Sequence, residues 1–490
     1  MKSHLFYIPI LISLTILSWH KILFQSLMGE GFFYFSHGAK EAGFPDIILR
    51  YDTGARLAFD LFKVIFKDEI FYYQLLAFLT LVLLSMLFYF LVHELTKRKL
   101  LATLASLFFS INFLGLFEMF AAGSYQFFIQ RAIYFLLLFP SFIFFVRYLN
   151  VRKEYNFIFS LLLYTTSLIL SQFSIFFLLF FLTYAFALVI VEKKIYKRVL
   201  IHAFLTFIIA YGDILYGSGS LIKGQNFLMF LGEEKYVLGQ QLLHQLTVLF
   251  VPHQIIQYLR EVFQLTFSTM VSFLHFPTLI GSLLIIVYLF VREKTLRVPL
   301  VAAAIFIPIV LLLNSYTRGT DFIGRIESGS RYLFVPSIAS SIIWAIFFYS
   351  LFSIRILFLK VFVVLLVVFY AYSNINVIWA EIDKDFYKHV ANKNSFQYIK
   401  GLSPSFSEDS LIVVPTNLGF HGSEFSQIFY GKANTTFVPF NSDWHKMLER
   451  PFDPKKDFIL EYDYKNEKVV DKTLEYEGII KKKEEVLKSN

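Results

Sequence analysis

Three arginines lie seven and six residues apart in a Gly/Ser-rich stretch between two apolar runs. They are Arg318, Arg325 and Arg331. A guanidinium fork matches the oxygens of a phosphate, and a partly dry interface strengthens such contacts. At a membrane surface, the phosphate that this pattern favours is that of a lipid. The alternative is that these arginines pair with Asp321 and Glu327 of the same stretch, or meet anionic headgroups.

A carboxylate that could act as a general base is Glu30, which lies between Gly29 and Gly31 about ten residues after the first apolar run. Glycines allow close backbone approach and unusual φ angles. Partial desolvation near the interface would raise the pKa of this carboxyl, which suits a general base. The alternative is a solvated loop acid.

Asp52 and Glu118 are two further candidate catalytic acids. Asp52 precedes a run that from residue 55 has apolar residues at helical spacing, which predicts an amphipathic helix lying in the outer interface. Asp52 and Arg56 are four residues apart, so they can instead form a helix-supporting pair. Glu118 lies near the outer end of an apolar run; an acid in a membrane is functional by default, but one at this end can also simply reach water.

The composition places these residues in a polytopic membrane protein. The 490 residues are 57% hydrophobic and 19% aromatic, which is more apolar surface than the charged residues of a soluble protein can cover. The chain has no cysteine, which excludes disulfides, thiolate nucleophiles and cysteine-based metal sites. The net charge of +9 comes mostly from short basic clusters between apolar runs, a topology signal and not a nucleic-acid footprint.

An apolar run of about 20 residues can cross a bilayer as a helix. The sequence predicts eleven such helices, at about 4–20, 71–95, 100–118, 126–147, 155–171, 173–191, 198–216, 266–291, 298–314, 332–352 and 356–378. Basic clusters lie at 96–99, 147–153, 192–198, 292–297 and 355. With eleven crossings all five clusters fall on one side, and the positive-inside rule then places the N-terminus in the cytoplasm. The join at Ser171-Gln172 is the weakest, because a single broken or re-entrant element there would reverse the topology downstream.

Two domains follow from this topology. Residues 1–378 form an all-α membrane domain with outer loops at 20–72, 217–265 and 315–331, and residues 379–490 form an extracytoplasmic α/β appendage.

Within the appendage, the pattern predicts a helix at 386–400 and strands at 410–415 and 458–464.

In this topology most of the polar residues outside the helices lie on the outer face, whereas a transporter needs polar groups near the midplane of the membrane. The sequence therefore favours a site at the outer membrane surface.

The order of these features resembles the GT-C superfamily of integral-membrane glycosyltransferases, nearest to the branch that contains the protein O-mannosyltransferases and many bacterial members. The specific similarity is Ser330-Arg331-Tyr332-Leu-Phe-Val-Pro-Ser337, which is similar to the R-Y-L-Y-L-P-S of that branch at a helix entry. The segment from residue 108 through Glu118 to 123 is similar to its third helix, and Gly29-Glu30-Gly31 stands where that branch has an acidic first-loop motif. The family often has two acids in that loop, and here Glu30 stands alone between glycines.

The resemblance implies transfer of a sugar from a polyprenyl-phosphate donor to an acceptor hydroxyl of a protein, glycan or lipid, with inversion at the anomeric carbon. Arg331, Arg325 and Arg318, with Tyr332, would bind the lipid phosphate, and Glu30 would be the base. The donor and membrane lipids are the expected partners, with no nucleic acid. No nucleotide is needed, and whether a divalent cation is a cofactor stays open. The alternatives are a transporter or lipid flippase, and a catalytically degenerate membrane scaffold.

Overall fold

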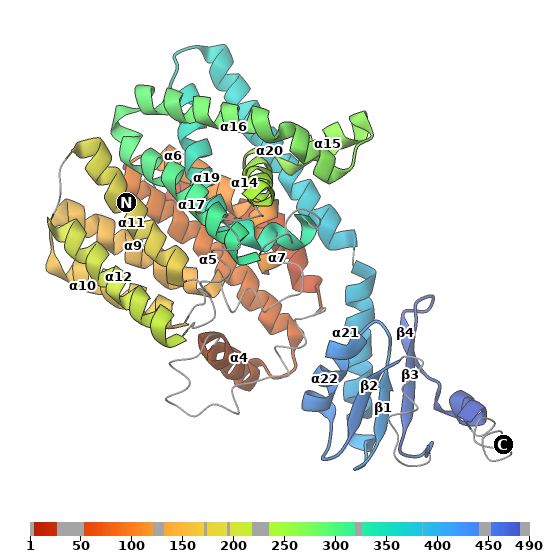
Figure 1. Ribbon diagram of the computed structural model, residues 1–490. Helices are drawn as coiled ribbons and strands as arrows, with labels where there is room; N and C mark the ends of the chain where they lie inside the picture. The colour runs from red at the N-terminus through yellow and green to blue at the C-terminus, as the bar shows by residue number, and fades with distance from the viewer. Residues whose placement is uncertain are drawn as a thin grey trace.

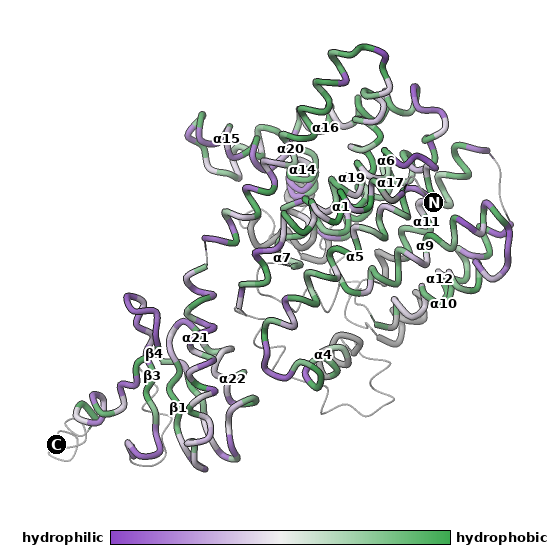
Figure 2. Tube along the Cα trace, turned by 180° about the vertical axis from the view of Figure 1, so that it is seen from behind, coloured by the Kyte–Doolittle hydropathy of each residue, from purple (hydrophilic) through white to green (hydrophobic). Residues whose placement is uncertain are grey.

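The computed structural model describes residues 4–26, 53–120, 132–170, 174–193, 197–217, 235–318, 326–384, 386–440 and 452–480. For some helical residues beside the gaps it describes the backbone only. Figure 1 shows a bundle of long helices with a smaller unit of helices and strands at one end. Figure 2 shows that apolar residues dominate the bundle, whereas the smaller unit is mixed.

Seven helical segments in the described part are long and apolar enough to cross a membrane. They are α1 (His4–Trp19) with η1 (His20–Phe24), α5 (Ile70–Thr96), η2 (Ala132–Tyr134) with α9 (Phe135–Val151), α16 (Phe267–Arg292), η3 (Lys294–Leu296) with α17 (Arg297–Arg318), α19 (Ile326–Phe352) and α20 (Leu357–Lys384). These segments are compatible with an integral membrane protein, and each matches one of the predicted apolar runs.

Helices also occupy the other four predicted ranges. They are α6 (Lys99–Ser110) with α7 (Phe113–Phe120), α10 (Glu154–Leu170), α11 (Ser174–Glu192) and α12 (Lys197–Gly217). The prediction of one continuous helix over 100–118 was wrong, because the chain breaks between α6 and α7. The Asn112 side-chain Oδ1 accepts a hydrogen bond from the Gly115 backbone N at 3.3 Å, which caps the start of α7. The total of eleven crossings stays a prediction.

Several of the basic clusters meet at one end of the bundle. Arg147 Nε donates to Glu94 Oε1 at 2.8 Å, which joins the ends of α9 and α5. Arg98 Nη1 lies 3.3 Å from Glu293 Oε2, which joins the α5–α6 turn to the α16–η3 turn. The clusters near residues 98, 147 and 293 therefore lie at the same end, as the topology predicts. The side of the membrane to which this end belongs stays a prediction.

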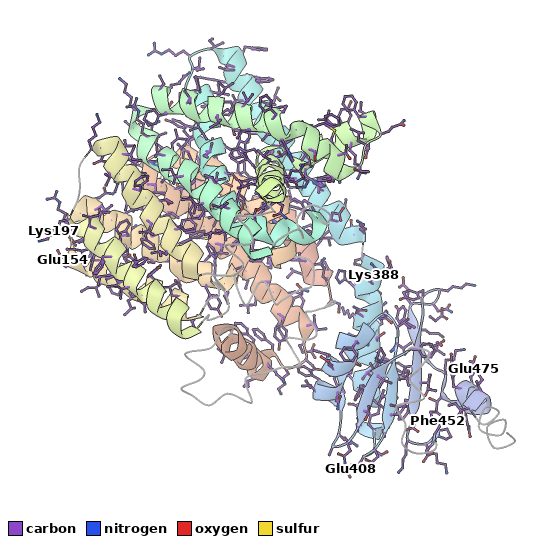
Figure 3. The ribbon with its side chains drawn as sticks, viewed as in Figure 1. Glu154, Lys197, Lys388, Glu408, Phe452 and Glu475 are labelled. Carbon is purple, nitrogen blue, oxygen red and sulfur yellow. The ribbon has the colours of Figure 1, made fainter. Side chains whose placement is uncertain are left out.

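The chain returns to this end between α10 and α12. Arg198 Nη1 lies 3.1 Å from Glu154 Oε1, so the first turns of α10 and α12 are neighbours. A single crossing between Glu154 and Arg198 would put them at opposite ends. Figure 3 shows Glu154 and Lys197 at the end of the molecule away from Lys388 and Glu408 of the smaller unit.

α19 is the central helix among the seven candidate spans. Buried residues make up 78% of its apolar 18-residue stretch. The corresponding share is 17% for α16 and 22% for α20, which lie at the periphery. α19 starts at Ile326, earlier than the predicted 332, so Arg331 and Tyr332 lie inside the helix and not in the loop before it. The acidic Glu327 near the helix start favours this earlier beginning, because negative charge is stabilised at a helix N-terminus.

Three helices occupy the predicted outer loops. α4 (Thr53–Phe66) confirms the amphipathic helix predicted after Asp52, and its Leu61, Val64 and Ile65 are exposed. α14 (Lys235–Phe250) and α15 (His253–Phe263) lie between α12 and α16. Figure 1 shows α4 beside the smaller unit, at the end opposite the basic turns.

The smaller unit is an α/β appendage, as predicted. It contains α21 (Phe386–Leu402), η4 (Ser403–Ser405), β1 (Leu411–Val414), α22 (Gly419–Tyr430), β2 (Thr436–Pro439), β3 (Phe458–Asp463), β4 (Lys468–Asp471) and a helix at 473–480. The strand order is β2-β1-β3-β4; β1 pairs in parallel with β2 and β3, and β3 pairs antiparallel with β4.

Both faces of the central strand β1 are covered. Ile412 and Val414 belong to the same apolar cluster as residues of α21 and α22, whereas Leu411 and Val413 pack with residues of the 473–480 helix. The continuous apolar run that predicted this strand follows from burial on both faces.

Candidate functional site

Ser337, the last residue of the Ser330–Ser337 segment of α19, lies directly against α7. A Cβ atom placed on Gly115 of α7 would lie 2.7 Å from Ser337 Oγ and 3.0 Å from Ser337 Cβ. The rings of Phe120 and Phe334 are 6.4 Å apart. As residue numbers rise along α7 they fall along α19, so the two helices run antiparallel at this contact.

This contact brings two candidate site residues onto neighbouring backbones. Glu118 follows Gly115 by three residues, and Arg331 precedes Ser337 by six, so they lie about 4.5 Å and 9 Å further along in the same direction. The side chains of both lie outside the described part of the structure.

The sequence explains why α7 and α19 can approach so closely. Small residues at a helix contact let two backbones come together, and here they are Gly115 and Ser337. Ser337 Oγ donates to the carbonyl of Phe334 at 2.7 Å, so its hydroxyl is satisfied within its own helix. Pro336 lies beside it and cannot donate a helical hydrogen bond.

Aromatic rings fix this part of α19 against three other helices. The Phe334 ring lies 5.0 Å from Phe135 of α9 and 6.0 Å from Phe109 of α6, in addition to its contact with Phe120. Phe334 has no solvent exposure. The backbone that carries Arg331 three residues earlier is therefore anchored by the packed core.

A cleft of about 90 Å³ lies deeper along the same helices, between the α6–α7 break, the α14–α15 junction, α19 and α20. Its polar lining comprises Asn112, His253, Ser340, Ser341, Tyr370 and Asn374. Trp344, Phe108 and Phe348 add aromatic surface. Among the described residues its lining is uncharged, which suits an uncharged polar group.

The polar groups of the cleft are partly satisfied within the protein. Ser341 Oγ donates to the Ser337 carbonyl at 2.7 Å, and Asn374 Nδ2 donates to the Tyr370 carbonyl at 2.9 Å. His253 Nε2 lies 2.8 Å from Gln257 Nε2. His253 Nδ1 is buried and has no hydrogen-bond partner within the described residues. An unmatched buried ring nitrogen costs free energy unless something outside the described part pairs with it.

The other predicted site residues are only partly placed. Glu30, Asp52 and Arg325 lie outside the described residues. Arg318 is the last residue of α17, and Tyr332 lies in the second turn of α19, but the side chains of both are outside the description. Of the predicted set, the structure therefore brings together the backbones of Glu118 and Arg331 and leaves the remaining geometry unassigned.

The described part contains no group of three or more His, Asp or Glu side chains placed to hold a metal ion. Among the described residues, the rings of His4 and His93 are 4.9 Å apart and those of His244 and His275 are 5.8 Å apart. Asp383, in the last turn of α20, pairs with Lys21 and so has a structural role.

The cleft residues were not singled out from the sequence, although a signal for them exists. Ser340, Ser341 and Asn374 are polar positions within two long apolar runs, and polar groups inside a membrane segment often mark a site.

No family model matches the chain, and no curated protein matches it in sequence.

Proposed function

We propose that this chain is an integral-membrane glycosyltransferase that moves a sugar from a polyprenyl-phosphate donor to an acceptor hydroxyl at the extracytoplasmic face. The observation that carries the proposal is the antiparallel contact of α7 and α19 at Gly115 and Ser337. It supports a shared site because one helix bears Glu118 and the other bears the Arg331–Ser337 segment that resembles the GT-C family.

In the proposed reaction the acceptor oxygen attacks the anomeric carbon while the bond from that carbon to the phosphate oxygen breaks. The polyprenyl phosphate leaves with the bonding electrons, and the acceptor proton passes to a carboxylate. Arg331 and Arg325, with Arg318 and Tyr332, stabilise the charge on the departing phosphate. A single displacement of this kind inverts the anomeric centre.

Glu30 is the proposed base, with Asp52 and Glu118 as the other carboxylates of the site. The polar and aromatic cleft below the α7–α19 contact suits an uncharged polar portion of a substrate, because hydroxyl and amide groups line it beside Trp344. The proposed topology has a cytoplasmic N-terminus and an extracytoplasmic appendage, which leaves the outer face free to meet acceptors.

The test uses purified protein in lipid with radiolabelled polyprenyl-phosphate mannose, glucose and arabinose. Wild-type protein is expected to turn over one of these donors, and Glu30→Gln to lose that turnover. The matched control is Glu154→Gln, which removes a carboxylate at the opposite end of the bundle and is expected to keep full activity. Turnover that survives Glu30→Gln would move the base to Asp52 or Glu118, or to Asp46 of the same predicted outer loop at 20–72. If Glu30→Gln and Arg331→Ala both kept full activity, the proposed mechanism would be wrong.

A further inference from the structure

Three turns of the chain meet around Arg98 at one end of the bundle. Arg98 lies between α5 and α6, and its Nη1 is 3.3 Å from Glu293 Oε2. Its Nη2 donates to Thr295 Oγ1 at 2.7 Å, in the turn between α16 and α17. Its guanidinium carbon lies 4.9 Å from the ring centre of Tyr349, in the last turn of α19. The α5–α6 turn, the α16–α17 turn and the end of α19 therefore form one surface, which we call the Arg98 surface.

The Arg98 surface has far more basic residues than acidic ones. The ranges 93–99, 288–297 and 349–360 contain eight lysines and arginines and two acids. The basic residues are Lys97, Arg98, Lys99, Arg292, Lys294, Arg297, Arg355 and Lys360. The two acids, Glu94 and Glu293, are largely buried, with side chains only 14% and 11% exposed. The exposed part of the surface is therefore strongly positive.

The acids do not neutralise every cation of the Arg98 surface. Both are already paired with other basic residues of the surface or with Arg147 of α9. In the part of the chain that the structure describes, Lys294, Arg297 and Arg355 have no carboxylate within ion-pair distance. Lys294 and Arg355 are also exposed. Uncompensated charges of one sign repel one another and attract an anion from outside the protein.

Aromatic contacts hold two of these cations close to the apolar bundle. The guanidinium carbon of Arg297 lies 4.6 Å from the ring centre of Phe290, and its Nε donates to the Phe290 carbonyl at 2.7 Å. Among the described residues, this leaves the two terminal nitrogens of Arg297 without a hydrogen-bond partner. Lys360 Nζ lies 5.7 Å from the ring centre of Phe352. Basic side chains near the ends of membrane helices pack their stems on apolar groups and keep the charge at the membrane surface.

We propose that the Arg98 surface binds the phosphate group of an anionic phospholipid in the leaflet at this end of the bundle. Arg297 and Lys294 donate to the phosphate oxygens, and Arg355 adds positive charge from the neighbouring turn. Arg98 holds the turns together and is a positioning residue. The occupant is a lipid because five of the candidate membrane spans have an end at these turns, which places the cations at the level of the headgroups. This inference does not depend on the proposed function.

The test measures by native mass spectrometry how tightly the purified protein binds phosphatidylglycerol, which is anionic, and phosphatidylcholine, which is not. Wild type is expected to bind phosphatidylglycerol more tightly. Lys294→Gln/Arg355→Gln removes two exposed cations and is expected to weaken phosphatidylglycerol binding about 10- to 30-fold, because each basic group near an anionic lipid adds to the affinity. Binding of phosphatidylcholine is expected to stay the same.

The matched control is Arg152→Gln/Lys153→Gln, which removes two exposed cations from the α9–α10 turn at the same end of the bundle. This control is expected to weaken phosphatidylglycerol binding less than about 3-fold, because its charges lie outside the Arg98 surface. Equal losses in the two double variants would overturn the proposed site, since they would show attraction by the total charge of this end.

A second measurement uses wild-type protein only. Raising the salt concentration from about 0.1 M to about 1 M shortens the screening length from about 10 Å to about 3 Å, and is expected to weaken binding of phosphatidylglycerol but not of phosphatidylcholine. An excess of inorganic phosphate at constant ionic strength is expected to leave phosphatidylglycerol bound. Displacement by inorganic phosphate would overturn the assignment to a lipid, and phosphatidylglycerol binding that ignores salt would overturn the role of the cations.

Discussion

Gly115 of α7 lies so close to Ser337 of α19 that a methyl group on Gly115 would lie 2.7 Å from the Ser337 hydroxyl oxygen. Gly115 belongs to the helix that carries Glu118, and Ser337 belongs to the helix that carries Arg331. The same contact that packs the bundle therefore sets the spacing between the helices that carry Glu118 and Arg331.

Substitution of Gly115 by alanine is expected to destabilise the protein by about 1–3 kcal/mol, because the added methyl group overpacks the helix contact. Ser337→Ala in the same chain removes the nearer of the two clashing atoms and should recover part of the loss. The measurement is the thermal unfolding midpoint in lipid. Gly281→Ala is the matched control, since a Cβ atom there meets nothing within 4 Å. Equal effects at both positions would contradict the close contact.

The hydroxyl of Tyr430 is expected to contribute to docking of the appendage. Tyr430→Phe removes its hydrogen bond to the ionised Asp68, and the expected loss is about 1.5–3 kcal/mol in the free energy of unfolding. Tyr464→Phe is the control, because Tyr464 is 52% exposed and its substitution should change stability by less than about 0.5 kcal/mol. Equal free energies of unfolding for the two variants would show that the Tyr430 hydrogen bond does not contribute to stability.

Lys400 contacts Asp68 and Glu69, and Tyr430 donates to Asp68, and these contacts predict a specific pH dependence. The folded-state pKa of Asp68 lies below its value in the unfolded chain, about 3.9. The ionised Asp68 carboxylate therefore stabilises the folded protein fully at pH values above the unfolded-state pKa. This stabilisation is lost as the pH falls through the lower pKa of Asp68 in the folded protein. The raised pKa of Lys400 keeps the ammonium charged up to about pH 10.

The measurement for this prediction compares unfolding of wild type with unfolding of Asp68→Asn from pH 3 to 9. The difference in stability is expected to be constant between about pH 5 and 9 and to shrink below about pH 4. A difference that already shrinks as the pH falls from 7 to 5 would contradict the lowered pKa of Asp68.

The sequence predicts much of the helical architecture because a long apolar run in a membrane must satisfy its backbone hydrogen bonds internally, and a helix does so. The break between α6 and α7 at Asn112 was missed because one polar residue inside an apolar run is a weak signal. The hydrogen bond from the Gly115 backbone N to the Asn112 side chain depends on the local backbone conformation, which the apolar pattern does not specify. The four-residue strands β2 and β4 were also missed, since so short a run carries little pattern.

Contacts between distant residues could not be predicted from a single sequence. Lys400 and Asp68 are 332 residues apart, and nothing in either local pattern specifies the other. The same holds for the cleft, which gathers side chains from four separate parts of the chain. For Glu30 and Asp52, the sequence supplies residue type and neighbours, whereas their geometry lies outside the described residues.

The most direct test of the central claim follows release of polyprenyl phosphate from a labelled donor by the purified protein in lipid. We predict release by wild type and by Arg355→Ala, an exposed arginine at the basic end of the bundle. Arg331→Ala is predicted to reduce kcat about 100- to 1,000-fold, as expected when a group that stabilises the leaving charge is removed. Equal rates for Arg331→Ala and Arg355→Ala would contradict the assignment of Arg331 to the departing phosphate.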